Sequence, residues 1–274
     1  MKAIPLPDDL TDDVLGRYVR PSGGVAGETK TRLKLPNLRA GMAQRRGITL
    51  GGPVSAFRRR VVAKLSYHKH NAPDAMGKLH GHVNYITRPG AGEQAVSATL
   101  FDGQSDDVKG HTVVSQWKDD RHHFRIIISP NDGAKFGDAE VMRARLRSPG
   151  SVTPERAAEI KEAAFRSYVR EVMGRMETEL GTKLTWFAGV HEKPDAAHPN
   201  NRHAHVVIRG VDDTGADLVM NKGYIQHGIR AAAEEIATRR LGTMSASELV
   251  EYQRRQTRDR GQAREQSNKK GRGL

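Results

Sequence analysis

The chain has 274 residues, with 45 Lys and Arg against 32 Asp and Glu, so its formal net charge is +13. This excess indicates a polyanionic partner, with nucleic acid ahead of an acidic membrane surface, although a merely soluble basic protein is the alternative. The absence of cysteine excludes disulfides, thiolate zinc sites and cysteine nucleophiles. No apolar run approaches the ~20 residues that span a membrane, and the N-terminus lacks a signal-peptide core, so we expect a cytoplasmic protein.

The length allows one large domain with tails. Residues 1–58 combine prolines, glycines and scattered charge without periodicity, which predicts a flexible, basic extension that either touches a phosphate backbone or has no role. The folded domain is expected over residues 59–242. Residues 243–274 should start as a helix, because Ser245 and Glu248 form a capping box, and should continue as a basic, disordered tail.

In chain order, the first strand is expected over residues 60–67, where β-branched residues alternate in part with others. A short helix should follow from Leu79 and end before Pro89, because the residue before a proline disfavours the helical conformation. Tyr85 lies near the end of this helix. The sequence HHFRIIISP, residues 122–130, predicts a buried strand with Phe124, Ile126 and Ile128 on one face and Arg125 and Ile127 on the other.

The longest helix is expected to begin at Pro154, because Thr153 suits the N-cap and proline suits the first helical position. Gly181 should end it. Apolar residues at three- and four-residue spacing predict a face in the core. They are Ala157, Ile160, Ala164, Tyr168, Val172, Met176 and Leu180.

Two strands, residues 184–191 and 203–210, are expected to pair in antiparallel fashion, because the segment between them is too short for a crossover helix. Residues 211–220 should form a turn and a short strand. A helix over residues 222–241 should then place Ile225, Ile229, Ala232, Ala233 and Ile236 inward, closed by Gly242. These elements predict an α+β fold with a central, mostly antiparallel β-sheet flanked by helices.

Three histidines suggest a metal site. Side chains alternate along a strand, so His203 and His205 should point the same way, and His191 ends the partner strand. Imidazole is the commonest neutral metal ligand among side chains, although such a pair also arises by chance. His198 lies in the connecting loop, where we expect it to be solvated or to hydrogen-bond a ligand.

A metal held by neutral histidines keeps its charge and leaves coordination positions open for substrate oxygens. In a basic protein the obvious substrate is a phosphodiester. Imidazole ligands suit Mn²⁺, Zn²⁺ or Ni²⁺. With water as the nucleophile the protein would be an ordinary nuclease, whereas a tyrosine would make it a strand-transferring enzyme.

The sequence resembles the VirD-type conjugative relaxases, which are mobilisation nucleases that combine metal-binding histidines with a catalytic tyrosine. The likeness covers about residues 60–242 and depends on several motifs in order, namely HVNYITRPG, DDRHHFRIIISPND, ELGTKLTW and HAHVVIRG. It implies a relaxase/Rep-like fold, with Mg²⁺ or Mn²⁺ as the usual metal.

Carried over residue by residue, the resemblance implies Tyr85 as the nucleophile and His191, His203 and His205 as metal ligands. The implied reaction is attack of the tyrosine hydroxyl on single-stranded DNA at a transfer origin, which leaves a 5′-phosphotyrosine link and a free 3′-hydroxyl. Because the covalent link conserves the phosphodiester energy, the reverse reaction can rejoin ends.

Other residues are assigned to this site as open alternatives. Asp195 could accept the tyrosine proton, orient a histidine, or be a solvated loop residue. His123, like His198, could support the metal ligands; His122 and His123 could also line a DNA channel or pack in the core. Candidates for contacts with DNA are Arg88, Arg125, Arg202 and Arg209.

Tyr67 and Tyr224 compete with Tyr85 as nucleophile. A replication initiator or transposase of the same chemistry is an alternative, as is a non-catalytic DNA-binding module with a structural metal. The resemblance also implies accessory relaxosome proteins, a type IV coupling and secretion machinery, and a bacterial protein exported while attached to DNA.

Overall fold

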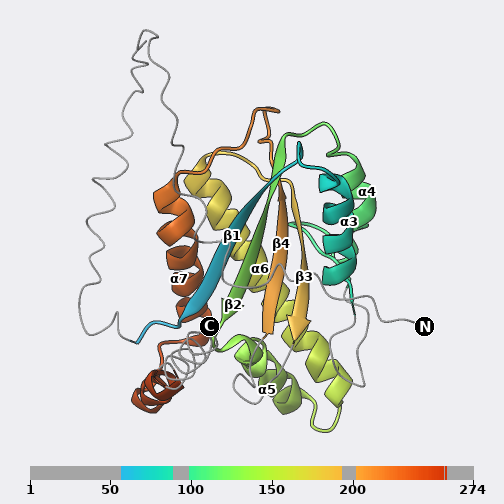
Figure 1. Ribbon diagram of the computed structural model, residues 1–274. Helices are drawn as coiled ribbons and strands as arrows, with labels where there is room; N and C mark the ends of the chain where they lie inside the picture. The colour runs from blue at the N-terminus through green and yellow to red at the C-terminus, as the bar shows by residue number, and fades with distance from the viewer. Residues whose placement is uncertain (1–56, 89–98, 193–201, 256, 258–274) are drawn as a thin grey trace, which may run out of the picture. The chain divides into compact units, whose positions relative to one another are not determined.

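The computed structural model describes residues 57–88, 99–192, 202–255 and 257 (Figure 1). Nearly all of the predicted N-terminal extension and most of the predicted basic tail lie outside the described residues, as do Asp195 and His198. Within the described parts of the chain, no helix is both long enough and apolar enough to cross a membrane.

The predicted α+β fold is confirmed by a four-stranded antiparallel sheet with helices packed on it. Its strands are ordered β1-β2-β4-β3, so the last strand in sequence lies inside the sheet and β3 forms an edge. The strand that ends near His191 pairs with the strand that carries His203, as predicted. The strands are β1 (Val61–Lys69), β2 (His122–Pro130), β3 (Trp186–Glu192) and β4 (Arg202–Arg209).

The helices include two that the sequence patterns did not predict, α4 and α5. Helix α5 buries only Val141, so it lacks the apolar periodicity that reveals a helix. The helical segments are α3 (Ala75–Ile86), α4 (Gly110–Ser115), a 3₁₀ turn η3 (Gly133–Lys135), α5 (Asp138–Arg147), α6 (Pro154–Leu180), a π-helical segment η4 (Tyr224–Gly228), α7 (Ile229–Leu241) and residues 246–255.

The long helix α6 has the predicted boundaries. The Thr153 side chain accepts a hydrogen bond from the Arg156 amide, proline occupies the first turn, and Gly181 ends the helix in the left-handed conformation with φ 73°. The buried face also includes Phe165, Val169 and Met173, whereas Ile160 and Leu180 are only half-buried. Figure 1 shows α6 crossing behind the sheet.

One face of the sheet carries the main core. Its inward residues, such as Ile126 of β2 and Val206 of β4, pack with the apolar residues of α6 and α7. Tyr168 of α6 is fully buried there and its hydroxyl donates to the Ala233 carbonyl at 3.2 Å. This face is an apolar core, as the alternation in HHFRIIISP predicted.

The opposite face is covered only in part. Helices α3 and α4 place Leu79, Val83 and Val114 against Phe187 of β3 and Val207 of β4 in a second, smaller core. On β1, by contrast, Val62 is 43% exposed and Lys64 is exposed. Polar residues of β1 and β2 on this face are therefore within reach of a ligand.

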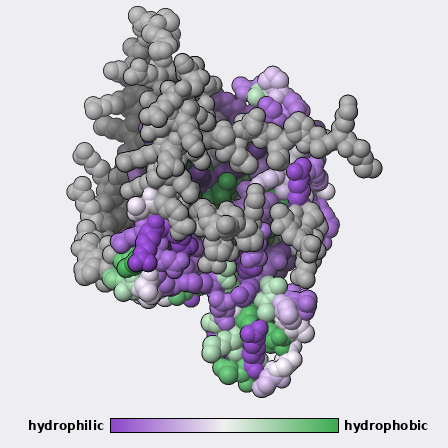
Figure 2. Space-filling model, turned by 60° about the horizontal axis from the view of Figure 1, so that its bottom comes forward, coloured by the Kyte–Doolittle hydropathy of each residue, from purple (hydrophilic) through white to green (hydrophobic). Residues whose placement is uncertain are grey.

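The surface seen in Figure 2 is mostly hydrophilic, with hydrophobic residues in small, separate areas. This agrees with the short set of exposed large hydrophobic residues in the described chain, which comprises Val62, Met142, Leu146, Val219 and Val250.

Two local predictions are corrected. Residues 211–220 contain a turn with an isolated bridge between Val211 and Asp217, and no strand forms in this segment. The helix after residue 222 begins as a π-helical segment. Gly228 lies against Tyr224 there: an added Cβ would lie 2.3 Å from a ring carbon, so the absent side chain makes room for the ring.

Candidate metal and tyrosine site

Three histidines meet where β3 and β4 pair. His191 stands directly opposite His203, and His205 follows two residues later, opposite Gly189. The ring centroid of His191 lies 5.7 Å from that of His203 and 4.8 Å from that of His205. One ligand nitrogen from each histidine lies within 4.8 Å of the others, so this cluster could hold a metal ion.

The hydrogen bonds of the cluster suit metal binding. The Nε2–H of His191 donates to the Ile86 carbonyl at 3.0 Å, which leaves the Nδ1 lone pair for a metal. The Nε2 atom of His205 is buried and has no hydrogen-bond partner within the described residues. A buried polar atom without a partner is costly, and a bound metal would satisfy it. The residues present therefore fit a metal.

Burial favours the neutral form of two of these imidazoles, those of His191 and His205. It lowers the pKa of His205 to about 2, helped by the charges that His191 and His203 would carry. Burial also lowers the pKa of His191, although the hydrogen bond to Ile86 acts in the opposite direction. Because only a neutral imidazole can bind a metal, both shifts prepare the ligands near neutral pH.

A glycine brings α3 onto this part of the sheet. A Cβ added to Gly189 would lie 2.7 Å from the Ile86 carbonyl oxygen, so any side chain would push the end of the helix away. This close approach carries Tyr85, the residue before Ile86, over the histidines. Gly189 is thus a structural requirement of the site that its sequence context did not reveal.

Tyr85 lies against the cluster, as the resemblance implied. Its ring centroid is 5.4 Å from that of His191 and 5.3 Å from that of His205, both with edge-on geometry. Tyr67 lies on the opposite face, against His122 and Phe124. The Tyr224 ring is buried in the main core. Of these three tyrosines, Tyr85 is the one whose ring contacts the three-histidine cluster.

The sequence analysis missed His82. It precedes Tyr85 by one helical turn, and its ring centroid lies 6.0 Å from that of Tyr85 and 5.9 Å from that of His205. Its Nε2 atom is buried without a hydrogen-bond partner in the described chain. Burial, followed by the positive charge of Arg125, lowers its pKa to about 3. The three-residue spacing within a predicted helix could have identified it.

The four arginines proposed as DNA contacts lie in different environments. Arg125 is half-buried on the sheet face of His205, and Arg88 is exposed after α3. Arg202 points to the other face, where its buried guanidinium pairs with Glu192 at 2.7 Å. Arg209 forms a two-pronged ion pair with Asp120, at 2.8 and 2.9 Å. Arg202 and Arg209 are thus held in ion pairs, whereas Arg125 lies on the sheet face of the histidines.

The neighbouring histidines of β2 also separate. His122 faces the main core, 4.8 Å from the Tyr67 ring. His123 faces the other way and contacts His68, His70 and Arg125. It belongs to a second polar cluster beside the three-histidine cluster.

Comparisons of the chain with protein-family models, with curated proteins and with solved structures found no match. What the site does is therefore inferred from its geometry and charge and from the sequence motifs.

Proposed function

We propose that this protein is a relaxase-type endonuclease, which nicks single-stranded DNA at a transfer origin with Tyr85 as nucleophile and a divalent metal at His191, His203 and His205. The observation that carries the proposal is the contact of the Tyr85 ring with two rings of a three-histidine cluster. A nucleophile beside an open metal cradle is the arrangement that phosphodiester transfer requires.

In the proposed reaction, the Tyr85 oxygen attacks the phosphorus and the bond from phosphorus to the 3′-oxygen breaks. The phenolic proton leaves to solvent or to a base, and the departing 3′-oxygen gains a proton. The products are a 5′-phosphotyrosine and a 3′-hydroxyl, and the reverse attack rejoins the strand. A bound divalent cation would offset the charge that develops on the non-bridging phosphate oxygens.

The ligand set favours a catalytic over a structural metal. Structural zinc sites usually close four ligands around the ion, and catalytic sites use three and keep one position open. The set found among the described residues has three members. Mg²⁺ and Mn²⁺ are the first candidates by resemblance, and Zn²⁺ and Ni²⁺ are the alternatives that imidazole ligands also suit.

The substrate class is supported by charge. The chain carries a formal net charge of +13, and Lys64 and Arg125 lie on the partly exposed sheet face of the histidines. Relaxosome proteins and a type IV coupling machinery are the partners that this function implies. A replication initiator or a transposase would use the same site.

A covalent-capture assay tests the proposal without a known origin sequence. The protein is incubated with a labelled, random-sequence pool of single-stranded DNA and Mn²⁺ or Mg²⁺, and denaturing electrophoresis then detects protein–DNA adducts. We expect an adduct that is lost in Tyr85→Phe and retained in Tyr67→Phe, which is the matched control on the other sheet face. Undiminished adduct in Tyr85→Phe would show that the nucleophile is another residue.

A further inference from the structure

A second polar cluster lies on the same sheet face as the metal-binding histidines. It consists of His68, His70, His123 and Arg125. The rings of His68 and His123 stack at 4.9 Å on the paired strands β1 and β2, and His70 follows β1. The chemistry described above uses none of the three histidines.

In the chain of hydrogen bonds that runs from Arg125 to Asp120, the donor and the acceptor of each bond are fixed. The Arg125 Nε–H donates to His123 Nε2 at 3.0 Å, because an arginine can only donate. His123 must then carry its proton on Nδ1, which donates to His70 Nε2 at 2.8 Å. His70 in turn donates from Nδ1 to the Asp120 carbonyl at 2.8 Å, because a carbonyl can only accept. Both histidines are therefore neutral, in the Nδ1–H form.

The two ends of this relay are fixed by the fold. Asp120 is held by its ion pair with Arg209 at 2.8 Å. Burial, and then the positive charge of Arg125, lower the pKa of His123 to about 2, which agrees with the neutral form that the hydrogen bonds require. Arg125 also donates from Nη2 to the Lys78 carbonyl of α3 at 3.5 Å. These two hydrogen bonds orient its guanidinium.

The sheet register places Arg125 beside the metal cradle. Ile127 stands opposite His205, and Arg125, two residues earlier on the same face, stands opposite Val207. Such diagonal neighbours lie about 7–8 Å apart between Cα atoms. Arg125 is half-buried, so solvent and ligands can reach part of it.

We propose that Arg125 forms a second phosphate subsite, which binds a backbone phosphate flanking the one at the histidines, and that His123 and His70 position it. The inference rests on the proposed function for its substrate class. A guanidinium can bind a phosphate through two parallel hydrogen bonds, and a guanidinium already oriented loses less entropy on binding. The relay fixes the angle of Arg125 through two neutral imidazoles.

Equilibrium binding of labelled single-stranded DNA to the full chain tests the positioning role. We expect Arg125→Ala and His123→Ala each to weaken binding, with Arg125→Ala raising Kd at least about tenfold, the loss typical of a hydrogen bond to a charged group. The double variant should bind no worse than Arg125→Ala, because His123 acts through Arg125. His123→Gln should recover part of the affinity, because its amide oxygen can accept from Arg125. Additive losses, or no recovery in His123→Gln, would overturn the positioning role.

Strands with one uncharged methylphosphonate identify the phosphate. In the wild-type protein, a methylphosphonate at one position of the strand should weaken binding, and Arg125→Ala should be insensitive at that position alone. Arg121→Ala removes the same charge from an arginine whose side chain is 82% exposed, and it should retain the wild-type pattern. Loss of sensitivity at every position, or at none, would exclude a defined subsite.

Binding does not require the tyrosine, so the two proposals fail separately. A methylphosphonate pattern that depends on Arg125, in a protein that forms no adduct, would retain the subsite and reject the tyrosine chemistry. An adduct lost in Tyr85→Phe, with no Arg125-dependent position, would do the reverse.

Discussion

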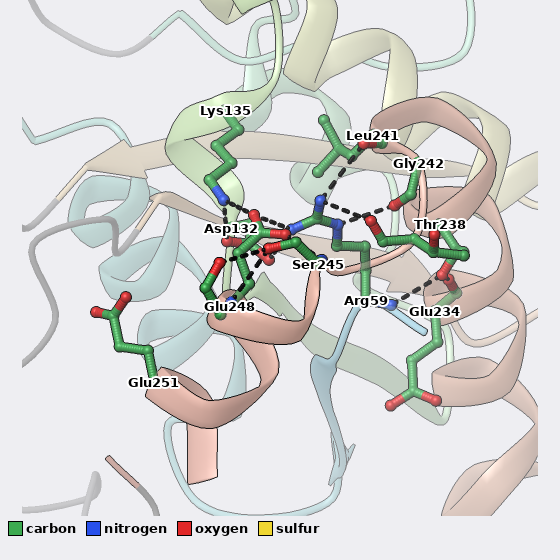
Figure 3. Close-up of polar contacts among 12 residues, drawn as sticks. Arg59, Asp132, Lys135, Glu234, Thr238, Leu241, Gly242, Ser245, Glu248 and Glu251 are labelled. Carbon is green, nitrogen blue, oxygen red and sulfur yellow. Dashed lines mark hydrogen bonds and ion pairs between the residues drawn. The ribbon is translucent and has the colours of Figure 1, made fainter. Parts of the chain in front are cut away.

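Two buried polar clusters in this molecule differ in how their hydrogen bonds are satisfied. The first surrounds Arg59, just before β1 (Figure 3). All five N–H groups of its guanidinium are used: Nη1 donates to Asp132 and Glu248, each at 2.9 Å, while Nε and Nη2 donate to carbonyls at the end of α7 and just after it, those of Gly242, Leu241 and Thr243. Lys135 pairs with the same two carboxylates.

The other cluster is the candidate metal and tyrosine site, in which the hydrogen bonding is incomplete. The Nε2 atoms of His82 and His205 are buried without a hydrogen-bond partner among the residues described. Each such atom costs about 1–3 kcal/mol of stability. The Arg59 cluster holds together segments far apart in sequence, whereas the histidine cluster has buried nitrogens that a metal ion could satisfy.

The largest expected effect is on the complete cluster. Burial alone would lower the pKa of Arg59, but its bonds to Glu248 and Asp132 raise it, so the charge is retained. Arg59→Ala removes the most deeply buried cation of the cluster and leaves both carboxylates with Lys135 alone, and we expect a loss of about 3 kcal/mol in the free energy of unfolding. Urea denaturation measures this loss. Arg121→Ala, which breaks an exposed pair with Asp217, should cost under about 1 kcal/mol. Equal losses in the two variants would show that the buried Arg59 cluster contributes no more to stability than the exposed pair of Arg121 with Asp217.

A divalent metal should stabilise the protein through the three-histidine cluster and not through the Arg59 cluster. Mn²⁺ at about a hundred times its Kd should raise the free energy of unfolding by about 2.7 kcal/mol. Calorimetric titration and thermal melting should show that His205→Ala abolishes both binding and the stabilisation. His227→Ala, at an exposed histidine, should retain both, as should Arg59→Ala if enough of it remains folded. Stabilisation that survives in His205→Ala would place the metal elsewhere.

Acid should affect the buried histidines and the Arg59 cluster in different pH ranges. The folded-state pKa values of His82, His123 and His205 are lowered to about 3, 2 and 2, so the unfolded chain binds more protons below its histidine pKa of ~6.5. The free energy of unfolding should therefore fall as pH drops below ~6.5, by up to about 1.4 kcal/mol per pH unit for each histidine.

The Glu248 carboxylate of the Arg59 cluster should respond to acid at a lower pH than these histidines. Burial would raise the pKa of Glu248, but hydrogen bonds from Arg59 and Lys135 bring it well below its usual range. Its stabilising contribution is therefore present above pH ~4.5 and is lost at lower pH. Urea denaturation between pH 7 and pH 5 gives the slope of the free energy of unfolding against pH. This slope should fall in His82→Phe by the contribution of up to one proton, and it should be unchanged in Glu248→Gln. An unchanged slope in His82→Phe would mean that this histidine is protonated in the folded state.

The smallest expected effect concerns salt. Log affinity for single-stranded DNA falls with log salt by about 0.7 for each phosphate neutralised. Arg125→Ala should therefore reduce this slope by about 0.7, as measured by fluorescence anisotropy across salt concentrations. Arg202→Gln, which removes the charge, should leave the slope unchanged, because Arg202 is buried and paired with Glu192. A slope that falls in the Arg202 variant and not in Arg125→Ala would mean that DNA contacts the other face of the sheet.

Local patterns in the sequence predicted the four strands of the sheet and the long helix α6, but neither α4 nor α5. Alternation in HHFRIIISP assigned the two faces of β2, and Thr153, Pro154 and Gly181 marked the ends of α6. The capping box is confirmed as well: the Ser245 amide donates to Glu248 at 2.6 Å, and the Glu248 amide donates to the Ser245 hydroxyl at 3.2 Å. Each of these signals lies within a few residues of the feature that it predicts, because caps and periodicity act between neighbours in the chain.

Tertiary structure decided what surrounds each polar group. The same period of two that aligns His203 and His205 also turns Arg202 to the opposite face, but only the packed core shows that this face is buried. His82 became part of the site because Gly189 lets α3 approach the sheet. The Arg59 cluster joins residues 189 positions apart. The sequence by itself determined the four strands, the ends of α6 and the pairing of the histidine strands. Which buried nitrogens have hydrogen-bond partners depends on contacts between distant segments, which no local pattern encodes.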